Sequence, residues 1–413
     1  MGLEPCQNNQ IGIAETNKNE QTSKKSAPLT VGILELVRLT FKKLSDILRT
    51  AFELRCNSWN PHGAFRVRIK KGVCPYMKKA LVMVLALALV LSCVSFASAD
   101  AKTYKVGVSI YQYTDNFMTL YRNEIEAYFK TLETDDVKYE ITMADGKNDM
   151  AEQTNQVRNF ITQGMDVIIL NLVQTSSADA VIDEIVAAGI PLVLINREPL
   201  AYDADGNTLD EKYEGILNND KVCYVGADAR QSGTFQGEMV ADLENHGDIN
   251  GDGKISYIMI EGDPENIDAQ YRTTFSVKAL TDAGYEVECL DDQVGNWDQT
   301  KGQELCANAL SKYGDKIEVV FCNNDGMALG AETAIIAAGR TVGQDIYLLG
   351  VDALPEAIDL IKEGNMTGTV LNDHIGQSHT AVDVAVKLLN GEAINNYYWV
   401  DYVKVDKAYV DAQ

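Results

Sequence analysis

Two patterns of apolar and polar positions alternate along residues 100–413. Short apolar runs rich in β-branched and aromatic residues, such as 104–111, are typical of buried strands. The segments between them, such as 117–129, repeat apolar residues at helical spacing and carry charged residues on the other side. This alternation predicts an α/β protein with doubly wound parallel sheets.

About ten strands are expected, which is more than one Rossmann-like domain holds. They are placed at 104–111, 139–143, 166–172, 192–196, 222–226, 256–260, 286–290, 318–322, 347–351 and 368–371. Further helices are placed at 149–162, 177–188, 231–245, 269–282, 299–312, 326–338 and 376–389. The polar insertion 202–220 is interpreted as a surface loop.

Two lobes are the natural division of this pattern. The N-terminal lobe is expected to comprise 100–226 with 373–400, and the C-terminal lobe 227–372 with 401–413. The last strand-like segment, 398–405, has no helix of matching size after it. It is therefore expected to cross the boundary between the lobes.

The first hundred residues do not follow the pattern. A basic stretch from Met77, an apolar run at 80–92 and a small-x-small site ending at Ala99 predict a secretory signal peptide at 77–99. Its apolar run is too short for a stable membrane span. Residues 1–76 are interpreted as a mis-called start or a disordered leader. Cleavage after Ala99 is favoured over a lipid anchor at Cys93, because Leu91 is bulky where a lipobox has small residues.

The net charge is more negative when residues 1–99 are left out of the count. Residues 1–99 hold 14 of the 36 basic and 6 of the 60 acidic residues, which leaves a net charge of about −32. Nucleic-acid phosphates require Lys and Arg, so a nucleic-acid partner is excluded. The balance fits an exported protein, in the periplasm or at the outer face of the cell membrane.

Few cysteines remain in the mature chain, and none has metal-ligand spacing. They are Cys223, Cys289, Cys306 and Cys322. They are interpreted as buried thiols, and the alternative is a single disulfide between two of them.

The segment 248–256 has the spacing of a calcium loop. Oxygen-bearing side chains stand at its first, third, fifth and ninth positions, and Gly253 stands at its sixth. The expected ligands are Asp248, Asn250, Asp252, the carbonyl of Lys254, and Ser256. The twelfth position is Met259 instead of Glu, and a strand follows, so an acidic Gly turn is the alternative. A shorter series at 203–207 is interpreted as a plain loop.

Polar residues follow many of the expected strands, where ligands of open α/β sheets bind. They are Asp115, Asn196, Asn323, Asn324, Asp325, Asp352, Asn372 and Asp373. Asp268 and Arg272 share a helix face and can pair in a fork, which fits vicinal hydroxyls, and Phe117 and Trp297 can stack on a sugar ring. Singly, each is more common as a cap, a turn, an ion pair or a core residue. Together they suit a neutral polyol.

Catalytic motifs are missing from the chain. There is no Gly-rich phosphate loop, no nucleophile elbow and no His-based zinc site. Carboxylate pairs are weak signs of glycosidase chemistry in so acidic a chain. The protein is therefore expected not to be an enzyme.

Several motifs occur together in one order. They are Tyr-Gln-Tyr-Thr-Asp-Asn-Phe at 111–117, Asn-Arg-Glu-Pro at 196–199, Asp268 with Arg272, Trp-Asp at 297–298, Asn-Asn-Asp at 323–325, Gly-Val-Asp-Ala-Leu-Pro-Glu-Ala at 350–357 and Gly-Thr-Val-Leu-Asn-Asp at 368–373. Over essentially all of 100–413 the chain thereby resembles the periplasmic D-galactose/D-glucose-binding proteins, of the type I periplasmic sugar-binding protein family. The resemblance implies two Rossmann-like lobes, joined by a three-segment hinge, that close over one monosaccharide.

The resemblance also implies roles for individual residues. Hydrogen bonds to the sugar are expected from Asp115, Asn196, Asp268, Arg272, Asn324, Asp352 and Asn372, with Phe117 and Trp297 on either side of the ring. Glu318 would complete a structural Ca²⁺ shell. Two positions depart from the family: Asn266 stands where it has a sugar-binding His, and Ser256 where it has Gln.

The sequence therefore predicts a monomeric, exported receptor that delivers a D-galactose- or D-glucose-like sugar to the membrane permease of an ATP-binding cassette importer. Alternatives of the same class are a receptor for methyl-galactoside, ribose or xylose, and a role in chemotaxis with a chemoreceptor as partner. A transcriptional repressor of related fold would need a helix-turn-helix where the signal peptide stands. An exported carbohydrate-active enzyme is the third alternative.

Overall fold

The computed structural model describes residues 101–175, 178–199 and 219–413, which belong to one compact unit. The interpreted leader, the signal peptide, Cys93, the series at 203–207 and nearly all of the insertion 202–220 lie outside these residues. Within them, no helix has the length and apolar character needed to cross a membrane.

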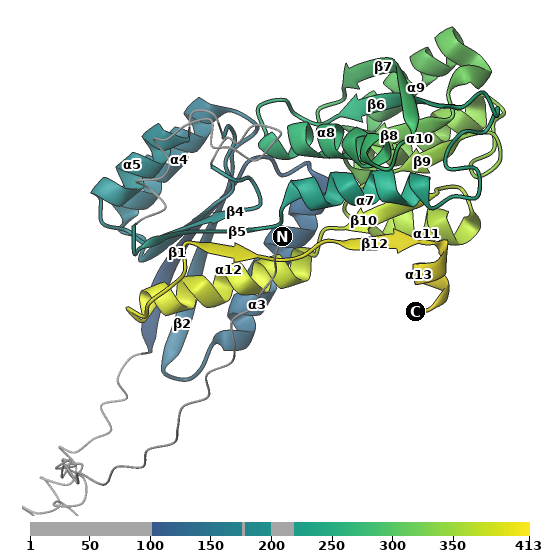
Figure 1. Cartoon of the computed structure of the whole chain (residues 1–413). Helices are drawn as coiled ribbons and strands as arrows, with labels where there is room; N and C mark the ends of the chain where they lie inside the picture. The colour runs from purple at the N-terminus through teal and green to yellow at the C-terminus, as the bar shows by residue number, and fades with distance from the viewer. Residues whose placement is uncertain (1–100, 176–177, 200–218) are drawn as a thin grey trace, which may run out of the picture. The chain divides into compact units, whose positions relative to one another are not determined.

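The N-terminal lobe is built on six strands. They are β1 (Lys102–Ile110), β2 (Val137–Asp145), β3 (Val167–Leu170), β4 (Leu192–Ile195), β5 (Val222–Gly226) and β11 (Tyr397–Trp399). Their order is β11-β5-β4-β3-β1-β2, and all neighbouring pairs are parallel. Figure 1 labels β1, β2, β4 and β5 of this sheet. Every residue of β3 and β4 is buried, as expected for strands with helices on both faces.

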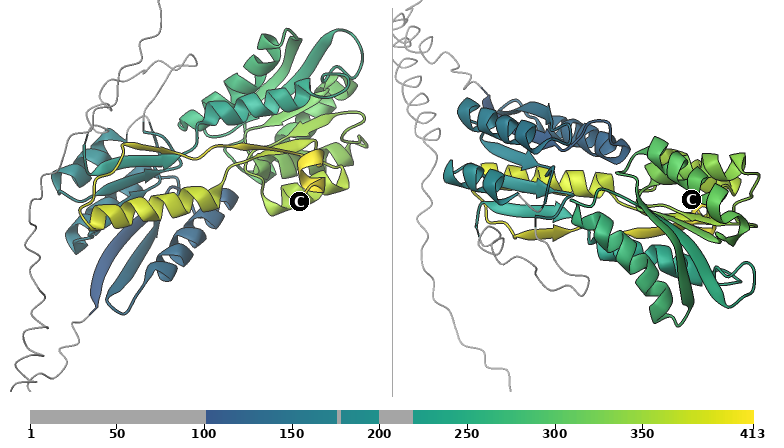
Figure 2. Two further views of the ribbon diagram at one scale, coloured as in Figure 1. Left: turned by 60° about the horizontal axis from the view of Figure 1, so that its bottom comes forward. Right: turned by 90° about the horizontal axis from the view of Figure 1, so that it is seen from above.

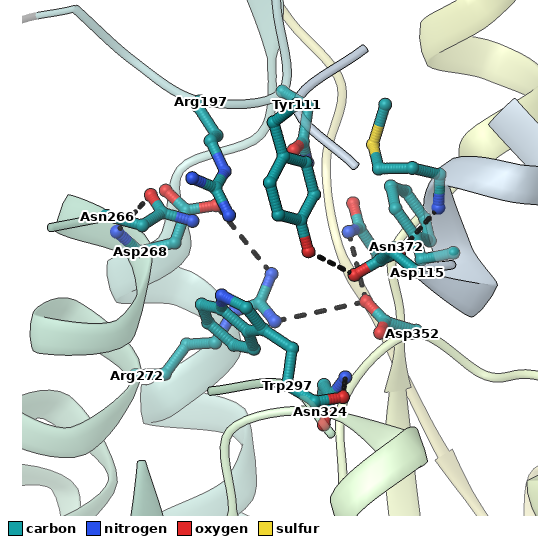
Figure 3. A pocket seen from close by; sticks show the side chains of 13 residues that line it. Tyr111, Asp115, Arg197, Asn266, Asp268, Arg272, Trp297, Asn324, Asp352 and Asn372 are labelled. Atoms are coloured by element: carbon teal, nitrogen blue, oxygen red, sulfur yellow. Dashed lines mark hydrogen bonds and ion pairs between the residues drawn. The ribbon is translucent and has the colours of Figure 1, made fainter. Parts of the chain in front are cut away.

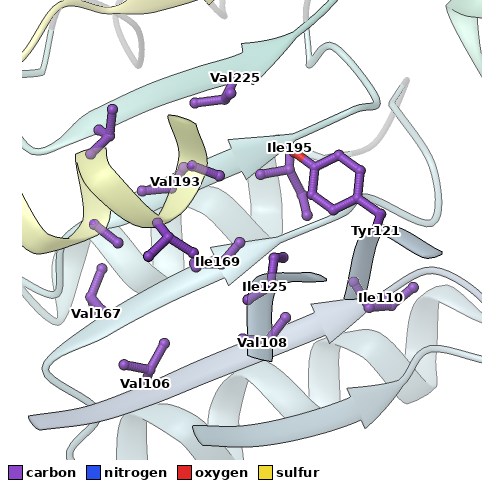
Figure 4. Close-up of a cluster of buried hydrophobic side chains, with 14 of the residues drawn as sticks. Val106, Val108, Ile110, Tyr121, Ile125, Val167, Ile169, Val193, Ile195 and Val225 are labelled. Carbon is purple, nitrogen blue, oxygen red and sulfur yellow. The ribbon is translucent and has the colours of Figure 1, made fainter. Parts of the chain in front are cut away.

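Helices cover both faces of this sheet. They are α3 (Asn116–Leu132) and α12 (His374–Leu389) on one face, and α4 (Met150–Gln163) and α5 (Asp179–Ala187) on the other. Figure 2 shows α3 and α12 side by side, although they are far apart in sequence. Figure 4 shows their cluster, where Val108 and Ile169 from the sheet meet Tyr121 and Ile125 from α3.

The C-terminal lobe repeats this plan. Its strands are β6 (Lys254–Glu261), β7 (Glu286–Val294), β8 (Val319–Cys322), β9 (Tyr347–Leu349), β10 (Gly368–Leu371) and β12 (Val403–Asp406). They lie in the order β12-β10-β9-β8-β6-β7. Its helices are α7 (Ala229–Ala241) and α8 (Ile267–Asp282) on one face, α9 (Gln299–Tyr313), α10 (Asp325–Ala337) and α11 (Pro355–Glu363) on the other, and a short α13 (Lys407–Asp411).

The expected α/β fold of two doubly wound lobes is confirmed, with corrections at the C-terminal end. The segment 398–405 is two strands, one in each sheet, and β12 is antiparallel to β10. β12 enters its sheet from the boundary between the lobes, whereas β10 runs toward that boundary. Helix α11 was not predicted.

Three short segments connect the lobes in the described chain. They are residues 227–228 between β5 and α7, 372–373 between β10 and α12, and 400–402 between β11 and β12. The carboxyl ends of the parallel strands in both sheets face this boundary (Figure 1). Polar residues after those strands are thereby brought together.

The cysteines differ in part from the prediction. All four described cysteines are free thiols, and Cys223, Cys306 and Cys322 are buried as expected. Cys289 is exposed. It lies on β7, an edge strand whose residues are mostly in contact with solvent.

Candidate functional site

A cavity lies between the two lobes (Figure 3). Its empty space is ≈ 320 Å³, including solvent at the mouth, which is the lower end of the range for small-molecule sites. It is lined by Tyr111, Asp115, Phe117, Met118, Asn196, Arg197, Asn266, Asp268, Arg272, Trp297, Asn324, Asp352 and Asn372. The structure thus brings all the predicted sugar-binding residues to one place, and adds Tyr111, Met118 and Arg197.

Asp115 lies where β1 leads into α3, and the protein itself holds its carboxylate. Oδ1 accepts the backbone N–H of Met118 at 2.7 Å, as the N-cap of α3. Oδ2 accepts the hydroxyl of Tyr111 at 2.6 Å. Because a carboxylate oxygen can accept two hydrogen bonds, this fixed carboxylate can still accept a ligand hydroxyl.

Arg197 is a pocket residue that the sequence analysis missed. Its side chain is 1% exposed, and its guanidinium lies 3.5 Å from the ring centroid of Tyr111, where a cation–π contact holds it. Nη1 donates to the carbonyl of Val173 at 2.7 Å, and the buried Nε has no hydrogen-bond partner. The available signal was its position directly after Asn196, at the end of a buried strand.

Asn266, Asp268 and Arg272 come from the first turns of α8. Asn266 is the N-cap, since its Oδ1 accepts the backbone N–H of Asp268 at 3.1 Å. The helix was expected over 269–282 and begins at Ile267, so Asp268 lies in its first turn. Arg272 lies one turn later, with Nη2 3.8 Å from Asp268 Oδ2, so the predicted shared face is confirmed.

Arg272 also connects the cavity to the hinge. Nη1 donates to the carbonyl of Asn323 at 2.7 Å and lies 3.9 Å from Asp352 Oδ1. Nη2 donates to the hydroxyl of Tyr402, in the third connecting segment, at 3.1 Å. The guanidinium is therefore fixed before any ligand arrives.

The cavity's asparagines are oriented as donors. The Oδ1 atoms of Asn196, Asn324 and Asn372 accept hydrogen bonds from Asn171 Nδ2, a backbone N–H of α10 and Gln377 Nε2, at 3.2, 2.9 and 2.5 Å. Asn266 Oδ1 is used for its helix cap. One N–H of Asn324 donates to the Trp297 carbonyl, and one N–H of Asn372 donates to Asp352 Oδ1, each at 3.2 Å. The remaining N–H groups of the four amides can donate to a ligand, and Asp115, Asp268 and Asp352 supply acceptors.

Three cavity residues adopt backbone conformations that favour glycine. The φ angles are +60° at Asn196, +64° at Trp297 and +123° at Asp352. Such conformations cost roughly 1–3 kcal/mol each and concentrate at functional sites. Here they direct side chains at the ends of strands and turns into the cavity.

Trp297 packs against apolar residues of both lobes and forms one wall. Gly262 lies against its ring, and a Cβ at Gly262 would be 2.1 Å from Cη2. Phe117, 6% exposed, lies on the other lobe. The structure therefore offers one aromatic face from each lobe.

Burial dominates the electrostatics of the cavity carboxylates. It raises the pKa of Asp268 to about 6, although Arg272 and Arg197 oppose the shift. It also raises the pKa of Asp352 well above its usual range, again against the effect of Arg272. Hydrogen bonds from ligand hydroxyl groups would stabilise the ionised form of both carboxylates.

Three other strand-end residues are structural. Asn323 Oδ1 accepts the backbone N–H of Gly262 at 2.9 Å. Asp325 accepts the Thr369 hydroxyl at 2.6 Å and a backbone N–H at 2.8 Å. Asp373 is the N-cap of α12. None of the three lines the cavity.

The candidate calcium loop lies in the C-terminal lobe, and Glu318 reaches it. Glu318 Oε1 accepts the backbone N–H groups of Ile249 and Asn250, at 2.7 and 2.9 Å, and Oε2 accepts that of Ser256, at 2.9 Å. Asp248 likewise accepts three backbone N–H groups within the loop. Among the described residues, no group of three or more His, Cys, Asp or Glu side chains is arranged to hold a metal ion.

Comparisons with known proteins agree with this architecture. A family model described as periplasmic binding protein domain matches residues 106–393. The D-galactose/methyl-galactoside binding periplasmic protein MglB of Haemophilus influenzae is 33% identical, over 80% of this chain and 97% of its own length. A putative rhizopine-binding protein of Rhizobium meliloti is 34% identical over the same shares.

Solved structures show the same fold. An ABC transporter solute binding protein from Bacillus halodurans, crystallised with bound myo-inositol, superposes with a TM-score of 0.64 at 30% identity. The alignment covers 76% of this chain and 98% of that one.

Proposed function

The chain belongs to the periplasmic binding protein family, and from this we propose that it is an exported receptor for a D-galactose- or D-glucose-like hexopyranose. The receptor closes its two lobes over one sugar and delivers it to the membrane permease of an ATP-binding cassette importer. Its action is binding and release, without covalent chemistry.

One observation carries the sugar assignment: the cavity lining combines fixed acceptors, fixed donors and two aromatic residues, one from each lobe. A hydroxyl group donates one hydrogen bond and accepts others, so it can pair with a carboxylate and an amide or guanidinium at once. A sugar that lacks one hydroxyl leaves a buried carboxylate or N–H without its partner, which costs about 1–3 kcal/mol. The site therefore favours a fully hydroxylated, uncharged ring.

The relatives support this chemistry without selecting one ring. The names above include a galactoside binder and a protein holding myo-inositol, a ring with a hydroxyl on every carbon. A cyclitol is therefore the second candidate ligand. Methyl-galactoside, ribose and xylose, and a role in chemotaxis, remain alternatives for the same site.

A thermal-shift panel tests the proposal. Ligands that bind only the folded state raise the melting temperature, and the stabilisation grows with the logarithm of the ligand concentration divided by its dissociation constant. D-Galactose or D-glucose is expected to give the largest shift, and a uronic acid none, because its carboxylate would face Asp115, Asp268 and Asp352. No shift with any hexose, pentose or cyclitol would exclude a sugar receptor.

A structural Ca²⁺ is proposed at 248–256 with Glu318. Carboxylate, amide, hydroxyl and carbonyl oxygens are the ligands that Ca²⁺ takes. A bound ion would compete for the carboxylate oxygens of Asp248 and Glu318 with the backbone N–H groups that now donate to them. Unfolding in Ca²⁺ and in chelator measures the effect, with a higher melting temperature expected in Ca²⁺. Equal melting temperatures would show a loop held by the Glu318 hydrogen bonds alone.

A further inference from the structure

Two pairs of residues make polar contacts between the lobes beside the cavity. Arg197 Nη1, from the N-terminal lobe, lies 3.5 Å from Asp263 Oδ2, directly after β6 of the C-terminal lobe. The hydroxyl and the backbone N–H of Thr175, after β3, both donate to the backbone carbonyl of Glu265, at 2.9 and 3.4 Å. Asp263 and Glu265 are not among the residues that line the cavity. Arg197 lines the cavity, whereas its partner Asp263 and the Thr175–Glu265 pair do not, so these three residues join the lobes from outside the ligand's contacts.

The segment that carries Asp263 is a rigid turn. The backbone N–H of Asn266 donates to the Asp263 carbonyl at 2.9 Å, and Asp263 Oδ1 accepts the N–H of Glu265 at 3.0 Å. Asp at the first position and Pro264 at the second fit a type I turn. Because Asn266 then caps α8, the turn joins Asp263 stiffly to the helix that carries Asp268 and Arg272.

Burial makes the ion pair sensitive to loss of one partner. The Arg197 side chain is 1% exposed and that of Asp263 is 11% exposed. Asp268 also interacts electrostatically with Arg197, and the proposed sugar contacts use the same carboxylate. Without the negative charge of Asp263, closing the lobes would remove water from the Arg197 guanidinium with one fewer carboxylate to offset the lost hydration. In the open state the guanidinium would keep its contact with water. The penalty thus falls on the closed state.

We propose that Asp263 is a positioning residue that stabilises the closed arrangement of the lobes through its ion pair with Arg197. The Thr175–Glu265 contact is a second stabilising interaction, and the two together are called the latch. The proposal rests on the proposed receptor function. The latch prolongs the residence of a bound sugar, and it raises the closed fraction when no sugar is present.

Asp263→Asn tests the latch, with Asp282→Asn as the matched control. Asp282 is an exposed carboxylate of the same lobe, paired with Lys278 and remote from the cavity. Asp263→Asn is expected to weaken sugar binding about tenfold or more, through faster dissociation in stopped-flow experiments with little change in association. X-ray scattering without sugar should show a larger radius of gyration. Asp282→Asn should match the natural protein in every measurement.

Thr175→Val is a second variant that leaves all charges in place. It should give a smaller increase in dissociation rate, in the same direction. The latch is wrong if Asp263→Asn dissociates and scatters like the natural protein. If Asp263→Asn does not fold, an unchanged dissociation rate and radius of gyration in Thr175→Val overturns it. Scattering needs no ligand, so it still tests the latch if the natural protein binds no sugar and the receptor function fails.

Discussion

At the scale of single residues, recognition depends on orientation as much as on residue type. Asn266 illustrates this, because its oxygen caps a helix and only its N–H groups remain for a ligand. The His that the resemblance implies at this position in related sugar-binding proteins would also present an N–H. Asn in place of His therefore keeps an N–H donor but places it at a different distance from the backbone. We expect this difference to change which sugar ring is preferred, and not to abolish binding.

Asn266→Asp tests the donor role. Aspartate also caps helices, so α8 should stay intact, but the variant replaces an N–H donor by a second acceptor beside Asp268. Calorimetry should show about 10–100-fold weaker sugar binding with an unchanged melting temperature. Asn266→His, which keeps a donor, is the control and should retain binding. Full affinity in Asn266→Asp would show that this amide does not donate to the sugar.

The raised pKa of Asp268 predicts that binding depends on pH. Ligand hydroxyls stabilise the ionised carboxylate, so binding lowers a pKa that starts at about 6 and releases protons near that pH. Affinity should be constant above pH 7 and fall about tenfold toward pH 5. Calorimetry in buffers of different ionisation heat measures both effects. Equal affinity at pH 5 and 7.5, with no proton release, would contradict this role for Asp268.

At the scale of elements, the site is built from the starts of helices. Asp115, Asn266 and Asn324 each cap the helix that follows a strand. Capping fixes the side chain through a backbone N–H, so the cavity wall is rigid before ligand enters. Glycine supports one wall, where Gly262 allows the ring of Trp297 to lie against the backbone.

Gly262→Ala should displace the ring of Trp297. The added Cβ cannot lie 2.1 Å from the ring, so the indole must move into the cavity or away from the ligand. Sugar affinity is expected to fall about tenfold or more, measured by calorimetry. The matched control is a double-mutant cycle with Trp297→Ala, in which Gly262→Ala should add little. Equal losses in both backgrounds would show that Gly262 acts independently of the indole.

At the scale of the whole molecule, two features could be predicted from the sequence: the strands of both sheets, and most of the residues that line the cavity. Apolar runs located both sheets, and polar residues after parallel strands located most of the cavity. Helix α11 was missed although Pro355 in its first turn and Gly364 after its last residue are helix start and stop signals. The direction of β12 depends on where the chain crosses between lobes, which no local pattern records. Tyr111 was assigned to a strand, and Arg197 was quoted in a motif without a role.

Calorimetric titration of the purified protein tests the central claim most directly. D-Galactose, D-glucose, myo-inositol and D-ribose would be titrated into the natural protein and into Trp297→Ala. The account predicts saturable one-to-one binding of a six-membered polyhydroxylated ring, tightest for one of the two hexoses, and at least about tenfold weaker in the variant. Silence with all four compounds, or equal binding by the natural protein and the variant, would contradict a sugar site between Phe117 and Trp297.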